Sequence, residues 1–356
     1  MRFLTRIKPL PIHARRSTLA AISAGSSQPM TSDTAQRFMP YVQALGRGPG
    51  RSRPLTRAEA ADALGMLLIP GAVDPHQAGA FLMLLRYRGE NGDELAGLVD
   101  AARVAVGAGP AAVDLDWPSY GAGRTREAPW FLLAALALAG AGLRIAMHGS
   151  NEFSSGFTVA EGLQALGRPV AADRAEAEAH LDRSGFAYLP LATLSQDLDR
   201  LLGLRRLFGL RSPINTLVRL MDPFDAAAGI DGVFHPPYID SHIAAAQRLE
   251  RPRLLVLKGG GGEAERNPAK PLAARLHRRG AEPLEILLPA LIDRPDGEPK
   301  PIGLDGFVAV WRGDRGPAGA TQTIIGTMAL ALIAAGRAAP AEADARALEI
   351  WRARPI

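Results

Sequence analysis

Hydrophobic positions in the first third of the chain recur at helical spacing and are separated by short turns. Residues 55–68 hold a Thr followed three residues later by a Glu, a capping box that leads into an apolar run. Asp74-Pro75 is a typical helix start, and a further helix is predicted to begin at Asn91 and end near Val106. These patterns predict a helical domain over residues 33–107.

After residue 107 short apolar runs alternate with longer apolar segments. The predicted strands are residues 113–115, 143–147, 254–257 and 308–311. The predicted helices are residues 129–140, 158–166, 271–279 and 321–336. Strands that alternate with helices favour a mostly parallel sheet covered on both faces. The sequence therefore predicts the α/β fold class: a small helical domain, with helices near 172–200 as candidate additions, and a larger doubly wound α/β domain over residues 108–345.

The first 30 residues differ in composition from the rest. They carry five of the 41 Lys and Arg and no acid, which suits a transit peptide, a disordered leader or a true start at Met30. We favour a flexible basic leader over residues 1–32 and a cytoplasmic protein. An uncharged apolar run of 18 residues is absent, so no membrane span is expected. The absence of cysteine excludes disulfides and thiolate chemistry.

Beyond the leader, bases and acids balance, so any anion-binding face must come from local clustering. Residues 200–221 hold five arginines and no acid, and residues 248–279 hold nine Lys or Arg against three Glu. If both segments line one groove, they form a positive track for a phosphate backbone, with Tyr238 as a candidate for stacking on bases. The alternative is that half of these arginines only solvate helix faces.

Five segments, in the right order, are similar to the anthranilate phosphoribosyltransferases and the related pyrimidine nucleoside phosphorylases. They are residues 55–99, 148–167 (HGSNEFSSGFTVAEGLQALG), 209–223 (GLRSPINTLVRLMDP), 232–249 and 327–338. The resemblance extends over roughly residues 36–340. It implies a nucleoside phosphorylase/phosphoribosyltransferase-like fold and a homodimer that pairs through the helical domain.

The phosphate-binding motifs of that family are only partly kept. Its Gly-Thr-Gly-Gly-Asp turn corresponds to residues 119–126, where two glycines remain, the aspartate is lost and two arginines, Arg124 and Arg126, are new. Its Lys-His-Gly-Asn-Arg motif corresponds to residues 147–151, where both cations are lost. The resemblance thus leaves a remnant phosphate or substrate cleft made of Gly121, Gly123, Arg124, His148, Gly149 and Ser154.

The family's adjacent Asp-Glu pair, which binds magnesium, is also missing. In its place residues 258–268 read KGGGGEAERNP, where Glu263 and Glu265 are accompanied by Lys258 and Arg266. This loop resembles a divergent branch of the family, the YbiB-like proteins, which is associated with nucleic-acid binding. The resemblance implies no catalytic residue, no metal site and no cofactor, with Mg²⁺ needed only if the chain is a transferase.

These observations favour a catalytically degenerate relative that binds DNA or RNA through the phosphate backbone without sequence specificity. The expected contact residues are Arg205, Arg206, Arg211, Arg219, Lys258, Arg266 and Lys270. The alternative is an active phosphoribosyl- or glycosyltransferase of altered substrate specificity. It is supported by the two glycines, by His148 and by Arg211, which matches the arginine that faces the aromatic carboxylate substrate in the family. A phosphorylase-like enzyme that uses inorganic phosphate is a third possibility.

Overall fold

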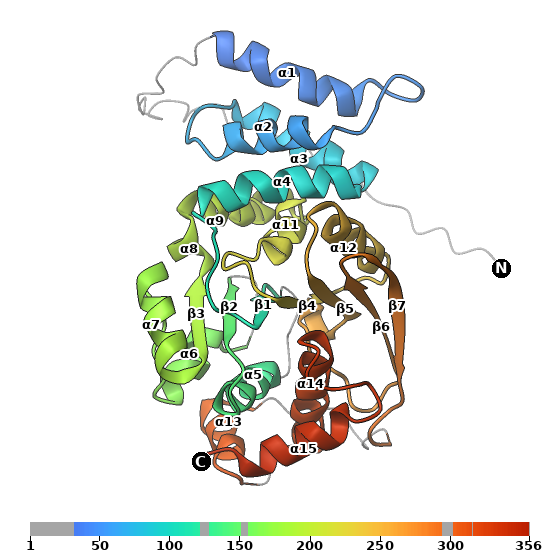
Figure 1. Ribbon diagram of the computed structural model, residues 1–356. Helices are drawn as coiled ribbons and strands as arrows, with labels where there is room; N and C mark the ends of the chain where they lie inside the picture. Colours follow the sequence, from blue (N-terminus) through green and yellow to red (C-terminus); the bar gives the residue numbers. More distant parts are fainter. Residues whose placement is uncertain (1–31, 122–127, 151–155, 294–301, 315, 356) are drawn as a thin grey trace, which may run out of the picture.

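The computed structural model describes residues 32–121, 128–150, 156–293, 302–314 and 316–355. Helices form one end of the molecule and an α/β body forms the other (Figure 1). Within the described ranges, seven strands make one sheet in the order β3-β2-β1-β4-β5-β6-β7. The strands are β1 (Leu115–Ser119), β2 (Ile145–Gly149), β3 (Phe186–Pro190), β4 (Ala228–Val233), β5 (Arg253–Lys258), β6 (Leu272–Arg278) and β7 (Ala281–Leu288). The architecture confirms the predicted fold class.

The order in which the chain adds strands to the sheet reverses between β1 and β4. Strands β1 to β5 pair in parallel, whereas β5, β6 and β7 pair antiparallel. The chain adds β2 and β3 on one side of β1 and then crosses over to add β4 and β5 on the other side. In doubly wound sheets ligands bind outside the carboxyl ends of the strands at such a switch point. The ends of β1 and β4 are therefore the place to look for a site.

The helical end is built from helices that the sequence predicts. They are α1 (Ser32–Gly46), α2 (Arg57–Leu67), α3 (Pro75–Arg88) and α4 (Gly92–Ala105). Thr56 with Glu59, and Asn91 with Glu94, form reciprocal capping boxes, and Asp74 caps α3 with Pro75 in its first turn. The polar residues that mark these helix starts in the sequence thus satisfy backbone N–H groups in the structure.

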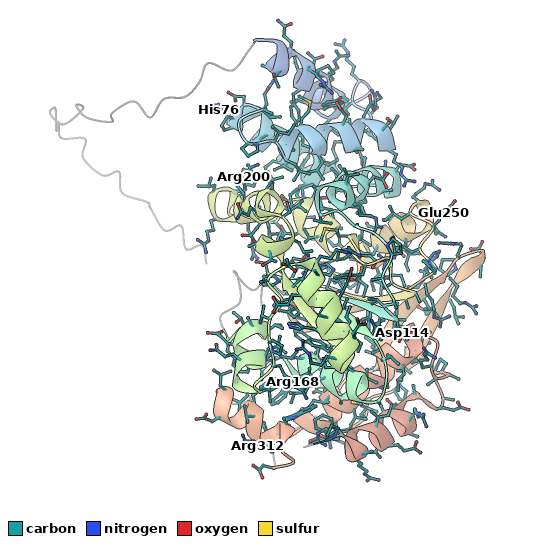
Figure 2. All side chains as sticks on the ribbon, turned by 60° about the vertical axis from the view of Figure 1, so that its left-hand side comes forward. His76, Asp114, Arg168, Arg200, Glu250 and Arg312 are labelled. Carbon is teal, nitrogen blue, oxygen red and sulfur yellow. The ribbon has the colours of Figure 1, made fainter. Side chains whose placement is uncertain are left out.

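Later segments of the chain pack beneath α4 (Figure 1). They are α8 (Leu191–Leu194), α9 (Gln196–Gly203), α10 (Arg205–Phe208), α11 (Ile214–Leu220) and α12 (Pro237–Arg248). Leu201 of α9 and Leu217 of α11 share one buried core with Phe38, Leu64 and Leu85 of the front helices. Figure 2 places His76 of α3 and Arg200 of α9 toward this helical end. α7 (Arg174–Ser184) packs on β3 instead.

Two apolar helices, α5 (Trp130–Gly140) and α14 (Ala320–Ala334), pack on the opposite face of the sheet. The helices α6 (Val159–Ala165), α13 (Leu304–Trp311) and α15 (Ala343–Ala353) complete this side of the molecule. Leu115 and Trp117 of β1 contribute to this core, whereas Asp116 lies on the other face, as the alternation of a strand requires. Within the described ranges no helix has the length and apolar character needed to cross a bilayer.

Two predicted elements have the wrong secondary structure. The sequence predicts a helix over residues 271–279, but these residues contain strand β6, which pairs with β5 and β7. Its Ala, Leu and Arg residues favour a helix, and strand pairing overrides that preference. The sequence predicts a strand over residues 308–311, but they belong to α13, where Phe307, Val310 and Trp311 bury one face. A short apolar run does not distinguish a strand from a buried helix.

Candidate functional site

A cavity of about 270 Å³ opens where the helical end meets the carboxyl end of β4. Four arginines contribute to its wall: Arg86 from α3, Arg205 from α10, Arg211 from the following loop and Arg219 from α11. We call this cavity the arginine pocket. The rest of its lining is Gly209, Leu210, Ser212, Asn215, Thr216, Val233, Phe234, His235, Tyr238 and His242.

Two of the arginines stack on aromatic rings that follow β4. The guanidinium carbon of Arg211 lies 4.8 Å from the ring centroid of Phe234, and that of Arg86 lies 5.1 Å from the ring centroid of Tyr238. Such stacking fixes the plane of a guanidinium and leaves its edge available for hydrogen bonds. The pocket therefore combines flat apolar surface with oriented cationic donors.

Among the described residues, the lining of the pocket contains four arginines and no Asp or Glu. Burial is the main cause that lowers the pKa of Arg211 to about 10, and the nearby charges of Arg219, Arg205 and Arg86 act in the same direction. Arg219 is buried, and burial lowers its pKa as well. An anion bound here would relieve the repulsion between these cations and would be held by charge-assisted hydrogen bonds.

Arg219 also connects the pocket to the turn after β1. Its guanidinium donates to the carbonyl oxygen of Tyr120 at 2.7 Å and to the carbonyl oxygen of Asn215. Tyr120 lies at the carboxyl end of β1, the other side of the switch point. The arginine pocket is thus joined to the place where the sequence resemblance puts a phosphate-binding turn.

His148 lies in a buried polar network on the sheet and does not line the arginine pocket. Its Nδ1 is 2.8 Å from the hydroxyl of Tyr120, and its Nε2 is 3.2 Å from a carboxylate oxygen of Asp116. Its side chain is fully buried. This arrangement supports a structural role for His148, one of the two interpretations that its place at a strand end allows.

The same network continues to a buried arginine. The guanidinium of Arg251 lies 3.7 Å from the carboxylate of Asp116 and 3.3 Å from that of Asp222. Burial raises the pKa of Asp222 to about 6, although the charge of Arg251 acts in the opposite direction. These groups connect β1, the loop before β4 and the segment before β5.

Loop 259–268 folds back against the ends of β1 and β4. The carboxylate of Glu263 accepts hydrogen bonds from the backbone N–H of Gly121 and, at 3.3 Å, from the hydroxyl of Ser119. A Cβ atom at Gly121 would lie 2.2 Å from that carboxylate oxygen. A Cβ atom at Gly232 in β4 would lie 2.0 Å from the backbone carbon of Glu263. Both glycines are therefore needed for the loop to approach this closely.

Glu265 from the same loop binds the start of α5. Its carboxylate accepts a hydrogen bond of 2.8 Å from the backbone N–H of Phe131, in the first turn of the helix. The α5 helix has no side-chain cap from its own N-cap residue, Pro129, and no acid in its first turn. Glu265 therefore supplies the negative charge that the start of a helix favours.

The predicted nucleic-acid contacts do not form one exposed track. Arg266, predicted as a contact to the phosphate backbone, is 1% exposed, pairs with Asp344 at 2.8 Å and donates to the carbonyl oxygen of Pro289. Arg219 is buried as well, in the wall of the arginine pocket. Arg205 and Arg211 line the pocket, whereas Arg206, Lys258 and Lys270 are exposed outside it.

The remnant cleft is described only in part. Gly123, Arg124 and Ser154 lie outside the described residues. Gly121 and Gly149 lie at the ends of β1 and β2, and a Cβ atom at Gly149 would be 2.0 Å from the backbone oxygen of Ser119.

Sequence reasoning missed Arg86 and Phe234 as pocket residues. The helix predicted to start at Asp74 does contain Arg86, but the neighbours of that arginine in the pocket lie over a hundred residues further along the chain. Phe234 follows β4, which was not among the predicted strands. The signal that could have found both residues is the switch point of the sheet, which requires the strand order to be known.

Comparison with known proteins agrees with this geometry. The helical bundle domain of a glycosyl transferase family matches residues 39–105, and the α/β domain of a glycosyl transferase family matches residues 131–286. Anthranilate phosphoribosyltransferase of Methylocella silvestris is 31% identical over 82% of this chain and 85% of its own length. That of Moorella thermoacetica is also 31% identical, over 80% of this chain and 86% of its own.

Solved structures share the fold. The anthranilate phosphoribosyltransferase of Thermus thermophilus superposes with a TM-score of 0.71 at 24% identity, over 88% of this chain and 94% of the other. The enzyme of Saccharomyces cerevisiae in complex with PRPP and Mg gives a TM-score of 0.67 at 15% identity, over 89% and 97%. At these identities the likeness establishes the architecture, and the chemistry has to be argued from the residues themselves.

Proposed function

We propose that this chain, which belongs to the glycosyl transferase family that includes the anthranilate phosphoribosyltransferases, has a phosphoribosyltransferase-type function with a small planar anion as acceptor. The observation that carries the proposal is the arginine pocket. Arg211 and Arg86 stack on Phe234 and Tyr238 and direct positive charge into one cavity beside the switch point of the sheet.

The pocket suits an aromatic carboxylate such as anthranilate. A carboxylate would accept hydrogen bonds from a guanidinium edge, and the ring would lie against the apolar surface of the pocket. Transfer would form a bond from the acceptor to the anomeric carbon of the sugar as the bond to the diphosphate leaving group breaks. Holding the acceptor in place beside the donor is the main contribution a protein makes to such a step.

Magnesium would accompany the phosphoribosyl donor, because the yeast enzyme forms a complex with PRPP and Mg. In contrast to the sequence-based expectation of no cofactor, the proposed transfer would use Mg²⁺ together with the donor. The carboxylates at hand do not fit a magnesium site as they stand, since Glu263 and Glu265 accept hydrogen bonds from Gly121 and Phe131. Within the described ranges no three His, Asp or Glu side chains are grouped to hold a metal ion.

Nucleic-acid binding is a weaker account of the same residues. Arg219 and Arg266 are buried, and Arg205 and Arg211 line a cavity of about 270 Å³. The exposed Arg206, Lys258 and Lys270 remain as candidates for phosphate contacts. A cavity of this size suits a small molecule better than a polymer backbone, so the transferase is the function we propose.

A homodimer is a further part of the proposal. Four large exposed apolar side chains lie in the described part of the helical bundle: Met39 (42%), Ile69 (60%), Tyr87 (91%) and Val104 (83%). Exposed apolar side chains on one part of a protein are typical of a surface that binds another protein. Pairing through the helical end would cover them.

Calorimetric titration with anthranilate tests the proposed acceptor site. We expect saturable binding of one anthranilate per chain, and in parallel a fluorescent single-stranded oligonucleotide should show little binding at about 50 mM salt. The opposite pair of results, no anthranilate binding and oligonucleotide binding that falls steeply as salt rises, would establish the nucleic-acid account in its place.

A further inference from the structure

The carboxylates of two glutamates in loop 259–268 accept hydrogen bonds from backbone N–H groups that could otherwise bind an anion. Glu263 accepts from the N–H of Gly121 in the turn after β1, and Glu265 accepts from the N–H of Phe131 in the first turn of α5. Exposed N–H groups in a glycine turn and at a helix start are the groups that bind phosphate in nucleotide-binding folds. Here a carboxylate of the chain itself takes each of them.

These carboxylates are built into the fold. Glu263 is 2% exposed and Glu265 is 5% exposed, and both lie in a loop whose backbone is packed against Gly232. A Cβ atom at Gly232 would first meet the backbone atoms of Glu263 and Ala264, at 2.0 and 2.3 Å. Buried polar groups are held in place by their hydrogen-bond partners, so these carboxylates keep their positions better than exposed ones would.

Arg266 fixes the far end of the loop. Its guanidinium pairs with Asp344 of α15 at 2.8 Å and donates to the carbonyl oxygen of Pro289 at 2.7 Å. Its backbone N–H donates to the hydroxyl of Thr327 in α14 at 3.0 Å. Close packing on Gly232 therefore holds one end of the loop at the strand ends, and the buried Arg266 holds the other end at the helix layer. Both carboxylates lie between these two fixed ends.

We propose that Glu263 and Glu265 are specificity-determining residues that oppose the binding of a diphosphate group at the ends of β1 and α5. A diphosphate would need the same N–H groups and would meet the two buried carboxyl groups that already accept hydrogen bonds from them. The inference rests on the proposed function in one respect, since it concerns the donor of the transfer. It predicts that the wild-type chain binds diphosphate weakly and that removal of the glutamates creates a site.

Calorimetry with inorganic pyrophosphate, with and without Mg²⁺, tests the inference. The variants are Glu263→Ala, Glu265→Ala and the double variant, with Glu263→Gln/Glu265→Gln as a charge-only change that keeps the shape of the loop. We expect the double alanine variant to bind pyrophosphate at least about tenfold more tightly than wild type, with the glutamine variant in between. Glu282→Ala/Glu285→Ala, on exposed positions of β7, is the matched control and should leave affinity unchanged.

Two further measurements separate this inference from its alternatives. Arg211→Ala in the double alanine background should keep the gained affinity, because the arginine pocket is a different site. Equal pyrophosphate affinity in wild type and in both double variants, whether strong or undetectable, would overturn the inference. Anthranilate binding by Glu265→Ala reports on the proposed function independently, because Glu265 does not line the pocket. Glu263 does not line the pocket either, but its charge acts on the pocket residue Arg219, so Glu263→Ala is not used for this comparison.

Discussion

At the residue scale, Arg211 is the pocket residue whose replacement tests the proposed acceptor binding. It stacks on Phe234 and is surrounded by the charges of Arg219, Arg205 and Arg86. Replacing Arg211 by Ala removes a charged donor whose hydrogen bond contributes about 1.5–3 kcal/mol. We expect anthranilate affinity to fall by about 10- to 100-fold, measured by calorimetry.

Arg206→Ala is the control for that change. Arg206 is exposed, lies in the same short helix as Arg205 and does not line the cavity. Anthranilate affinity should stay within about twofold of wild type, a difference that single surface changes commonly give. If both variants weaken binding equally, the effect is general electrostatics and the pocket does not recognise the acceptor.

Asp222 gives the protein a pH dependence with a defined sign. Its pKa is raised from 3.8 to about 6 by burial, so the folded state binds a proton more tightly than the unfolded chain. The stability that this carboxyl contributes is present below pH 3.8 and is lost as pH rises through about 6. The loss is on the order of 3 kcal/mol, because one pKa unit corresponds to about 1.36 kcal/mol.

Urea unfolding of wild type and of Asp222→Asn, measured from pH 3.8 to above about 6, tests this effect. The free energy of unfolding of wild type relative to the variant should fall as pH rises through this interval and become constant at higher pH. A relative stability that increases over the interval would mean that the charged form of Asp222 is favoured by Arg251 more than burial disfavours it.

Residue roles were only partly predictable from the sequence. Arg211 could be predicted as a ligand-binding residue from the surrounding motif, and it lines the pocket. Arg219 and Arg266 have the same charge in equally basic segments but are buried, because their partners Tyr120, Asp344 and Pro289 are distant in sequence. A local count of charges contains no information on such partners.

At the scale of elements, the glycine in β4 makes room for loop 259–268. Replacing Gly232 by Ala would place a carbon 2.0 Å from the backbone of Glu263, and backbone cannot rotate away as a side chain can. We expect the free energy of unfolding to fall by about 3 kcal/mol, the upper part of the usual range for overpacking. Urea unfolding is the measurement.

Gly260→Ala is the control for the loop. A Cβ atom at Gly260 has no heavy atom of the described chain within 4 Å, and the residue lies in the same segment. The free energy of unfolding of the Gly260→Ala variant should differ from that of wild type by less than about 0.5 kcal/mol. Equal losses in the two variants would show that any side chain disturbs this segment and that close packing on β4 is unimportant.

Helix starts were the most predictable elements. The Thr56–Glu59 and Asn91–Glu94 boxes depend on contacts within four residues, so the sequence contains the whole interaction. Strand β6 depends on pairing with β5 and β7, and its sequence gives no alternating apolar pattern that would reveal it. Loop 259–268 was recognised as unusual, but the partners of its glutamates were not predictable because Gly121 and Phe131 are more than a hundred residues away.

At the scale of the whole molecule, the proposed homodimer predicts a particle of twice the 37.7 kDa chain mass in analytical ultracentrifugation. Tyr87→Asp/Val104→Asp places charges on exposed apolar positions of α3 and α4 and should shift the particle to a monomer. Leu287→Asp, at a 70% exposed position of β7, is the matched control and should stay dimeric. A wild-type monomer at all concentrations would remove the dimer from the account.

The order of helices and strands made the two-domain architecture predictable as a whole. Helical spacing before residue 107 and alternation after it led to the observed arrangement, although the antiparallel β6 and β7 were not foreseen. The function was harder to predict, because it depends on where a few side chains point. The basic segments suggested a nucleic-acid track, and folding places several of their arginines in the core or around a small cavity.

The central claim is that the chain keeps an acceptor site for phosphoribosyl transfer while its own glutamates oppose the donor's diphosphate. Its most direct test is the rate of diphosphate release from phosphoribosyl pyrophosphate with Mg²⁺, with and without anthranilate, for wild type and Glu263→Ala/Glu265→Ala. We predict release that depends on anthranilate in both proteins and is faster in the variant. Absence of anthranilate-dependent release from both proteins would contradict the account.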